Sequence, residues 1–138
     1  MPPAATNSPS GMGTGFPDVC KTVVGPSVVP IPYPNEVDFS DANPSTLADS
    51  ILICGFPAAT AETVIMLSQG DDAGELGGVV SQVVMGPAKP MLGSMNVFLK
   101  GIPAAYLGSP LGMNGVPESN CPLGVHDTAC QFTVMVGA

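Results

Sequence analysis

The fold is decided by the stretch Asp49-Ser-Ile-Leu-Ile-Cys-Gly-Phe-Pro-Ala-Ala-Thr60, whose pattern returns as Met95-Asn-Val-Phe-Leu-Lys-Gly-Ile-Pro-Ala-Ala-Tyr106. In each copy an apolar run is closed by Gly-x-Pro-Ala-Ala, so that Gly55 corresponds to Gly101. Gly admits positive φ, whereas Pro fixes φ and removes an N–H donor. An apolar run that ends in both therefore predicts a strand followed by a tight turn. We expect each copy to form a β-hairpin corner, with two alanines small enough to pass close to a neighbouring strand.

Composition also favours a fold made of short strands. The chain has 138 residues, which is the size of one domain. It contains 17 glycines and 16 prolines, yet 45% of its residues are hydrophobic and only 10% are charged. A chain this apolar does not stay disordered, and many short strands require many turns. Because no segment shows a sustained helical period, the sequence predicts an all-β fold of short hairpins without a substantial helix.

Charge argues against two classes of partner. Three lysines, Lys21, Lys89 and Lys100, stand against 11 acidic residues, which gives a formal net charge of −8. Three scattered lysines do not neutralise a phosphate backbone, so nucleic-acid binding is not expected. The same sign disfavours an anionic membrane surface, and no apolar run is long enough to span a bilayer. We therefore expect a soluble protein without stable membrane insertion, and its N-terminus lacks the features of a Sec signal peptide.

The sequence predicts two parts. Residues 1–15 are rich in Pro, Ser, Gly and Asn and indicate a flexible arm, whereas residues 16–138 form the β-hairpin domain. The prolines between Pro26 and Pro34 exclude a helix and a central strand, which leaves a stiff edge strand or a polyproline path. Other strands are expected at 62–68, 77–85 and 131–136, of which the second is the most β-prone run of the chain.

Several motifs between residues 16 and 115 resemble one protein family. The segment Asn96-Val-Phe-Leu-Lys-Gly-Ile-Pro-Ala-Ala-Tyr-Leu-Gly-Ser-Pro110 resembles the strand and turn that give PAAR-repeat proteins their name, with Tyr106 where the motif ends in Arg. Pro57-Ala-Ala-Thr60 is a second, weaker copy. The PAAR-like branch of the family is similar in three further segments: Phe16-Pro-Asp-Val-Cys-Lys-Thr22, Val29-Pro-Ile-Pro-Tyr-Pro-Asn35 and Ser68-Gln-Gly-Asp-Asp-Ala-Gly-Glu-Leu-Gly-Gly-Val-Val-Ser81.

This resemblance implies a small cone or pyramid of β-hairpins that caps the trimeric VgrG-type spike of a contractile injection system. Such a system is a type VI secretion machine or a phage-tail-like particle. The implied protein is structural, with one copy per spike trimer, and it sharpens the spike for piercing a target envelope. It is assembled in the cytoplasm and then carried at the tip of the apparatus. The alternative is an adaptor module that tethers an effector protein to the spike, for which the segment 1–15 would serve as the arm.

The resemblance also implies one zinc ion near the apex, because PAAR proteins hold zinc there through histidines and a cysteine. In this chain the candidate ligands are Cys121, His126 and Cys130, in the spacing C-x4-H-x3-C, with Cys20 or Cys54 as a fourth. The competing interpretation is that Cys121 and Cys130 form a disulfide or stay free while His126 is an exposed side chain. A disulfide framework is not favoured, because the sequence shows no Sec signal peptide that would direct the cysteines to an oxidising compartment.

Aromatic residues and an open strand edge indicate which residues contact a partner. Aromatic residues are enriched at interface centres, and an unblunted strand edge invites pairing. The candidate spike-binding residues are Phe16, Tyr33, Val79, Val80 and Tyr106.

No Gly-x-Ser-x-Gly elbow exists, and any catalytic pair would have to use the single histidine, so the protein is not expected to be an enzyme. The acidic residues Asp71, Asp72 and Glu75 are predicted to form a solvated turn rather than a Ca²⁺ site.

Overall fold

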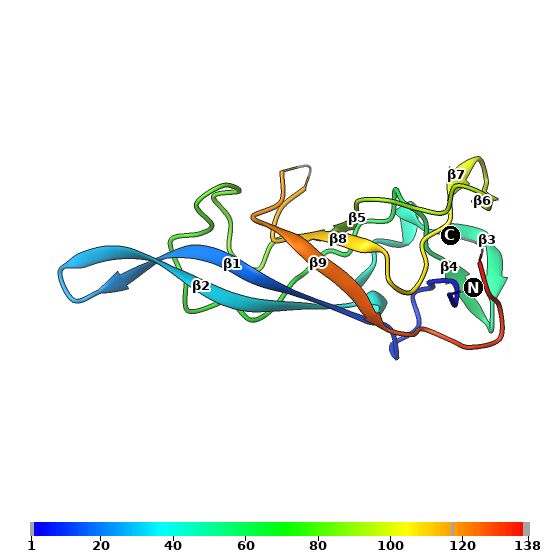
Figure 1. Cartoon of the computed structure of the whole chain (residues 1–138), viewed down its shortest axis with the longest axis horizontal. Helices are drawn as coiled ribbons and strands as arrows, with labels where there is room; N and C mark the ends of the chain where they lie inside the picture. The colour runs from blue at the N-terminus through cyan, green and yellow to red at the C-terminus, as the bar shows by residue number, and fades with distance from the viewer. Residues whose placement is uncertain (1, 117, 137–138) are drawn as a thin grey trace.

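A long hairpin runs along one side of the computed structural model and projects beyond the rest of the chain (Figure 1). It consists of β1 (Met12–Val24) and β2 (Ser27–Asp38), joined by a turn in which Gly25 has φ +59°. β2 pairs with no other strand of the described residues than β1 and is an edge strand, as its prolines predicted, although Glu36 near its end also forms an isolated bridge with Gln69. Pro30 and Pro32 lie opposite Lys21 and Val19. Having no N–H, these prolines leave the outer edge of β2 short of donors, which blunts it against pairing with another strand.

The structure describes residues 2–116 and 118–136. β1 and β2 belong to a five-stranded antiparallel sheet in the order β2-β1-β9-β8-β5, which we call the shaft. The other three strands of the shaft are β5 (Lys89–Pro90), β8 (Pro110–Met113) and β9 (Cys121–Thr128). Two single 3-10 turns, η1 (Phe39–Asp41) and η2 (Pro44–Thr46), are the only helical elements of the described residues. In this part of the chain no helix has the length and apolar character needed to cross a membrane.

Two short hairpins lie at the end of the molecule opposite to the Gly25 turn, and we call this end the base (Figure 1). They are β3 (Ala48–Ile53) with β4 (Phe56–Ala58), and β6 (Phe98–Leu99) with β7 (Ile102–Pro103). Both repeats of the sequence are therefore hairpins, as predicted. Their turns match, since Gly55 has φ +85° and Gly101 has φ +81°, and the preceding residue is left-handed in both. A side chain larger than Gly is strained at such a φ.

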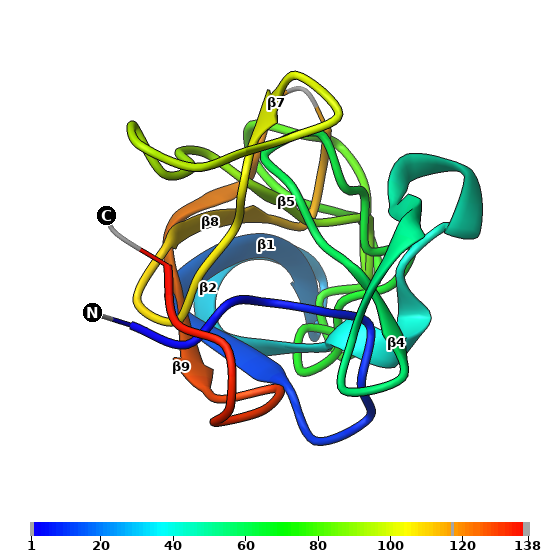
Figure 2. The same ribbon diagram turned by 90° about the vertical axis from the view of Figure 1, so that its right-hand side faces the viewer.

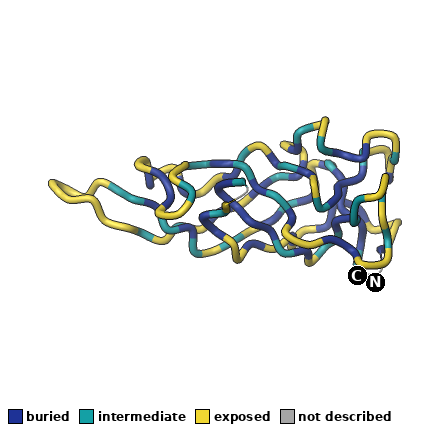
Figure 3. Tube along the Cα trace, turned by 90° about the horizontal axis from the view of Figure 1, so that it is seen from above, coloured by how far each residue is buried: buried dark blue, intermediate teal, exposed yellow. Residues whose placement is uncertain are grey.

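The molecule tapers from the base to the Gly25 turn, and buried residues gather in the shaft and the base (Figure 3). Where the shaft is narrow, its strands approach closely. A Cβ on Gly15 of β1 would lie 2.8 Å from Met113 Sδ and 2.9 Å from Cys121 Sγ. The all-β, tapering architecture agrees with the fold predicted from the sequence. The shaft encloses one apolar cluster: Ala5, Val37, Phe39, Ala42, Leu47, Ala59, Ile65, Ala88, Ala105, Leu111, Met113, Cys121 and Cys130.

Residues 2–15 differ from the flexible arm that the sequence predicted. Ala4, Ala5 and Thr6 are buried, and residues from Met12 onward belong to β1. The physical reason is that small side chains in this segment fill the space between the two base hairpins, so that little polar surface is left for water. The segment is an integral part of the fold.

Three expected strands are also absent as continuous strands. Residues 77–85 form turns, and Val79 and Val80 are exposed. Asn120 Oδ1 accepts the Val80 N–H at 2.8 Å, so this donor does not pair with a neighbouring strand. The segments 62–68 and 131–136 contribute only isolated bridges. In these segments side chains and single bridges satisfy the backbone, and this tertiary context overrides β propensity.

Candidate functional site

The base contains a third copy of the repeat that sequence reasoning missed. Pro3-Ala-Ala-Thr6 matches Pro57-Ala-Ala-Thr60 and Pro103-Ala-Ala-Tyr106. The first alanine of each copy belongs to a second apolar cluster, which lies in the base: Ala4, Ala48, Ile53, Ala58, Ala104 and Val136. This copy has no hairpin of its own, so only the four-residue motif itself could have revealed it in the sequence.

The three copies are joined in a closed ring of backbone hydrogen bonds. The Ala5 N–H donates to Ala105 O (2.9 Å), the Ala105 N–H to Ala59 O (3.1 Å), and the Ala59 N–H to Ala5 O (2.9 Å). All three alanines are at most 1% exposed. Because each copy donates once and accepts once within the cycle, the ring has the connectivity of a three-fold axis inside a single chain. We call it the alanine ring.

A second cycle of hydrogen bonds repeats the same symmetry in the opposite direction. In each bond the residue four places after the motif proline donates to the carbonyl oxygen of the proline in another copy. The three bonds are Asn7 N to Pro57 O (3.2 Å), Ala61 N to Pro103 O (2.8 Å) and Leu107 N to Pro3 O (2.9 Å). Two concentric cycles of this kind hold the copies in fixed positions around the axis.

The copy Pro3-Ala-Ala-Thr6, the first in the sequence, completes its hairpin with a segment near the other end of the chain. The Ala4 N–H donates to Val134 O (2.9 Å), as the Ala104 N–H donates to Val97 O (3.0 Å). The Gln131 side chain supports this strand substitute, since its Nε2 donates to Ala4 O at 3.0 Å. Seen from the base, the segment that begins at Pro2 lies beside the segment that ends at Val136, and both are separate from β4 and β7 (Figure 2). The base therefore carries three hairpin-like units, one of them built from both ends of the chain.

Equivalent positions of the three units expose large apolar side chains. Leu52, Phe98 and Met135 are 62%, 56% and 42% exposed. Each is followed by a residue that packs into or against the base cluster, so strand alternation directs these three outward. An apolar set repeated three times on one end of a molecule is typical of an interaction surface.

The residues predicted to bind a spike do not share one surface. Tyr106 packs against the base cluster and its backbone pairs with Ala4. Tyr33 lies on β2, where its hydroxyl is 2.7 Å from Thr22 Oγ1. Val79 and Val80 lie in the loop that Asn120 holds. Of the five candidates, only Tyr106 belongs to the base.

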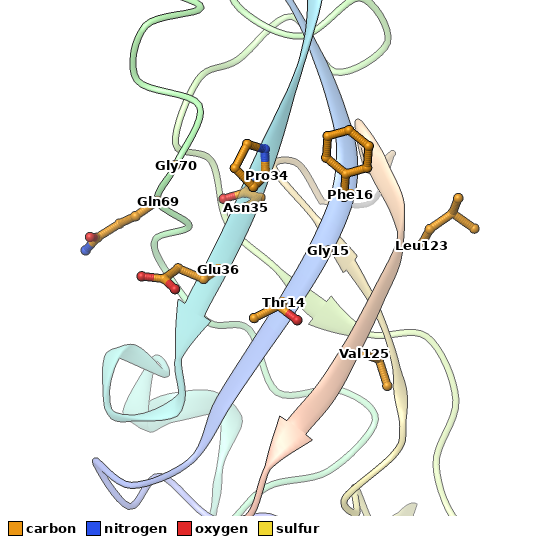
Figure 4. Close-up of a pocket in the computed structure, with 10 residues that line it drawn as sticks. All are labelled: Thr14, Gly15, Phe16, Pro34, Asn35, Glu36, Gln69, Gly70, Leu123 and Val125. Atoms are coloured by element: carbon orange, nitrogen blue, oxygen red, sulfur yellow. The ribbon is translucent and has the colours of Figure 1, made fainter.

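Phe16, the remaining candidate, borders a shallow groove on the outside of the shaft. The groove has a volume of about 450 Å³ and crosses β2, β1 and β9 (Figure 4). Phe16 is 59% exposed and Leu123, from the neighbouring β9, is 69% exposed. The groove is apolar on the β9 side and is bordered by Glu36 and Gln69 on the β2 side (Figure 4).

The predicted zinc ligands Cys121, His126 and Cys130 are not gathered around one point. Both ring nitrogens of His126 face backbone carbonyls, with Nδ1 3.1 Å from Tyr106 O and Nε2 2.9 Å from Thr128 O. Cys130 Sγ lies 3.7 Å from His126 Nε2, but Cys121 lies beside Gly15 in the shaft. All four cysteines are free, so the disulfide alternative is not formed. His126 is 1% exposed and stacks on Phe39, with ring centroids 4.2 Å apart.

A different cluster of ligand-type side chains lies buried in the shaft. One ligand atom each of Asp18, Cys20 and Asp71 lie within 4.8 Å of one another, and none of the three residues is exposed to solvent. Cys20 Sγ is 3.6 Å from Asp18 Oδ1 and 3.7 Å from Asp71 Oδ2. Asp18 and Cys20 face the same way because they are two residues apart in β1. Asp71, which the sequence indicated as part of a solvated turn, is instead buried against them.

The electrostatics of this cluster follow from burial next to like charge. Burial, together with Asp18 and Asp71, raises the pKa of the Cys20 thiol to about 12. Burial and the neighbouring Asp18 raise the pKa of Asp71 to about 7. Without a cation, the cluster therefore keeps protons on the thiol and, near neutral pH, on a share of the Asp71 carboxyl groups. Such a group of donors can hold either protons or a metal ion.

Comparison with known proteins agrees with the sequence motifs. Residues 11–122 match the family model described as the Toxin PAAR-like domain. Neither the search of curated proteins nor the search of solved structures returned a significant match. The matched region includes β1, β2, both base hairpins and all three cluster residues, whereas the first alanine copy and the segment around Val134 lie outside it. Because the match spans most of the chain, the protein belongs to the Toxin PAAR-like domain family.

Proposed function

We propose that this protein is the tip of a contractile injection system and caps the trimeric VgrG-type spike through its base. The observation that carries the proposal is the alanine ring, which gives a single chain the connectivity of a three-fold axis. A trimer that ends in three equivalent surfaces is matched by three equivalent hairpin units. One copy per trimer follows from this symmetry, since a single chain already supplies all three units.

Docking in this proposal uses the exposed apolar side chains of the base. Leu52, Phe98 and Met135 occupy equivalent positions, so each meets the same surface of one spike subunit. Apolar side chains at the centre of an interface contribute most of its affinity. Membership of the PAAR-like family supports this assignment, because the family resemblance points to spike tips and effector adaptors.

The opposite end serves as the point. The hairpin of β1 and β2 extends beyond the other three strands of the shaft and ends at the Gly25 turn, so the cross-section of the molecule decreases along its long axis (Figures 1 and 3). The proposed action is mechanical and uses no catalytic group. The protein is assembled onto the spike in the cytoplasm and travels with it into the target envelope.

The test is binding to a purified spike trimer, with cryo-EM of the complex. The triple variant Leu52→Asp, Phe98→Asp, Met135→Asp should weaken binding at least about 100-fold. The matched control is Val28→Asp, Met66→Asp, Leu123→Asp, which adds the same charge at exposed residues outside the three hairpin units. The control should bind normally. Density for the chain away from the spike end, or equal binding by both variants, would remove the proposal.

A second candidate function, tethering an effector, has one observation in its favour. The apolar groove beside Phe16 and Leu123 lies on the shaft, where it stays open when the base is covered. Under this alternative, Phe16→Asp abolishes effector recruitment while the complex with the spike is unchanged. Pull-down of an effector by the assembled spike, with and without this change, separates a tip from an adaptor.

A further inference from the structure

We infer that Asp18, Cys20 and Asp71 form a binding site for one divalent transition-metal ion, best matched by zinc, in the middle of the shaft. Two carboxylates and one thiol point at a common centre from two segments of the chain, β1 and the loop after Gly70. The inference does not depend on the proposed docking of the base. It also differs in every residue except Cys20 from the ligand set that the family resemblance suggested.

The first argument is charge balance. Asp18 and Asp71 are both fully buried, and no basic side chain of the described residues reaches them. The three lysines are engaged elsewhere: Lys21 with Gln82, Lys89 with Glu62 and Lys100 with Asp49. Buried carboxylates without a cationic partner are rare, because desolvation penalises the charge unless it is paired or coordinates a metal.

The second argument is the orientation of the amides around the cluster. The Nδ2 group of Asn114 donates to Asp18 Oδ1 at 3.2 Å and lies 3.8 Å from Cys20 Sγ. That of Asn120 also donates to Asp18 Oδ1 and lies 4.0 Å from Cys20 Sγ. Donors of this kind on the outer side of a carboxylate and a thiolate are what metal ligands have, since they fix each ligand and leave its other lone pairs free.

Backbone contacts fix these two amides, so their orientation is not an arbitrary choice. Asn114 Oδ1 accepts the Gly86 N–H at 2.8 Å. Asn120 Oδ1 accepts the Val80 N–H at 2.8 Å, while its Nδ2 also donates to Val19 O at 2.8 Å. In both residues the oxygen is committed to the backbone, and the N–H₂ group must face the cluster.

The third and independent observation is an orphan oxygen. Asn35 is 2% exposed, and its Oδ1 atom has no hydrogen-bond partner. The other end of the same amide points into the cluster, where Nδ2 donates to Asp18 Oδ2 at 2.8 Å. An unpaired buried oxygen needs an explanation, and an ion is one of the few available. Turning the amide about its last side-chain bond would bring this oxygen toward Asp18 as a fourth metal ligand, in exchange for the Nδ2 hydrogen bonds to Asp18 Oδ2 and Ser68 Oγ.

The donor set selects the metal. Tetrahedral zinc sites take four ligands from thiolate, imidazole and carboxylate groups. A thiolate disfavours Ca²⁺ and Mg²⁺, which require oxygen ligands, and two carboxylates disfavour Cu(I). Binding replaces protons: the ion takes the place of the Cys20 thiol proton and of any proton on Asp71, and these protons are released to solvent.

The experiment uses the full chain, treated with a chelator and then titrated with Co²⁺ as a spectroscopic substitute for zinc. One equivalent of Co²⁺ should produce a thiolate-to-cobalt charge-transfer band, and one equivalent of Zn²⁺ should remove it. Zn²⁺ should also raise the Tm. Cys20→Ser should lose the band, whereas the matched control Cys121→Ser, which removes another buried cysteine of the shaft, should keep it. Asp71→Asn should weaken Zn²⁺ binding at least about tenfold.

Two results would overturn the inference. A wild-type chain that gives neither a charge-transfer band nor a Tm shift with Zn²⁺ has a proton-sharing polar cluster and no metal site. A band that survives in Cys20→Ser and disappears in Cys121→Ser places the thiolate ligand elsewhere. Because the first readout needs only the unaltered protein, it stands even if a variant fails to fold.

Discussion

The backbone N–H of Ala5 donates to the carbonyl oxygen of Ala105, which joins the first alanine copy of the chain to the last. Both alanines are also bonded to Ala59, so the contact is one side of a closed triangle. Side chains larger than alanine do not fit in the ring, because the backbones of two other copies approach each alanine. The size of these residues is therefore a requirement of the ring.

Enlarging an alanine of the ring should destabilise the protein. Ala59 is fully buried between the copies, and Ala59→Leu should lower the free energy of unfolding by about 1–3 kcal/mol through overpacking. Urea unfolding measures the change. The control Ala73→Leu, at an exposed turn position, should stay within about 0.5 kcal/mol of the parent. Equal effects of the two changes would contradict the packing of the ring.

Deleting residues 2–7 should abolish cooperative unfolding. The deletion removes two of the three hydrogen bonds of each cycle, together with the bonds from Ala4 N–H to Val134 O and from Gln131 Nε2 to Ala4 O. Thermal unfolding followed by circular dichroism gives the result. A truncated chain that melts within a few degrees of the full chain would mean that the segment is the free arm the sequence first indicated.

His126 should make stability fall in mildly acidic solution. Burial lowers its pKa from 6.5, against the opposing effects of the Tyr106 and Thr128 carbonyls and of Asp127. Below pH 6.5 the unfolded chain therefore binds a proton that the folded chain resists. The contribution of neutral His126 to the free energy of unfolding is fully present above pH 6.5. It is lost as the pH falls toward the pKa of His126 in the folded state, by at most about 1.4 kcal/mol per pH unit.

The measurement compares urea midpoints at about pH 7.5 and pH 5.5 with those of His126→Gln. Cys130 lies beside the ring and is held as a thiol, since burial raises its pKa, so it adds no charge in this range. The wild type should lose more stability than the variant between the two pH values. A variant with the same pH dependence would assign the effect to carboxylates.

Asn120 should be worth more to stability than its type suggests. Its side chain holds Val80 N–H, Val19 O and Asp18 at once, and Asn120→Ala removes all three hydrogen bonds, one of them to a buried carboxylate. We expect a loss of about 2–4 kcal/mol. Asn7→Ala is the matched control, since Asn7 Oδ1 is buried without a partner and its removal should cost little. Denaturant unfolding of both variants decides.

The hairpins of the base were predictable because their information is local. Gly55 and Gly101 sit in turns whose flanking strands follow in the sequence, and Gly-x-Pro marks them without any tertiary knowledge. The first alanine copy carries the same word but not the preceding strand. Its partner is Val134, at the other end of the chain, so no window of sequence contains the pair.

The buried cluster was hidden for a different reason. Asp18 and Cys20 alternate on one strand, and the sequence could have placed them on one face. Asp71 lies in a Gly-Asp-Asp run that is typical of an exposed turn. Its burial is decided by long-range packing against β1. The same applies to residues 77–85, where Asn120 takes up backbone donors that propensity assigns to a strand.

The closure of the third hairpin unit also has a kinetic consequence. Ala4 and Val134 are far apart in the sequence, so their hydrogen bond cannot form until all the residues between them are present. Contacts of such high sequence separation slow folding, because loop-closure entropy is lost before the contact stabilises the chain. The base should thus be the last part of the protein to consolidate, and early intermediates should contain the β1–β2 hairpin without it.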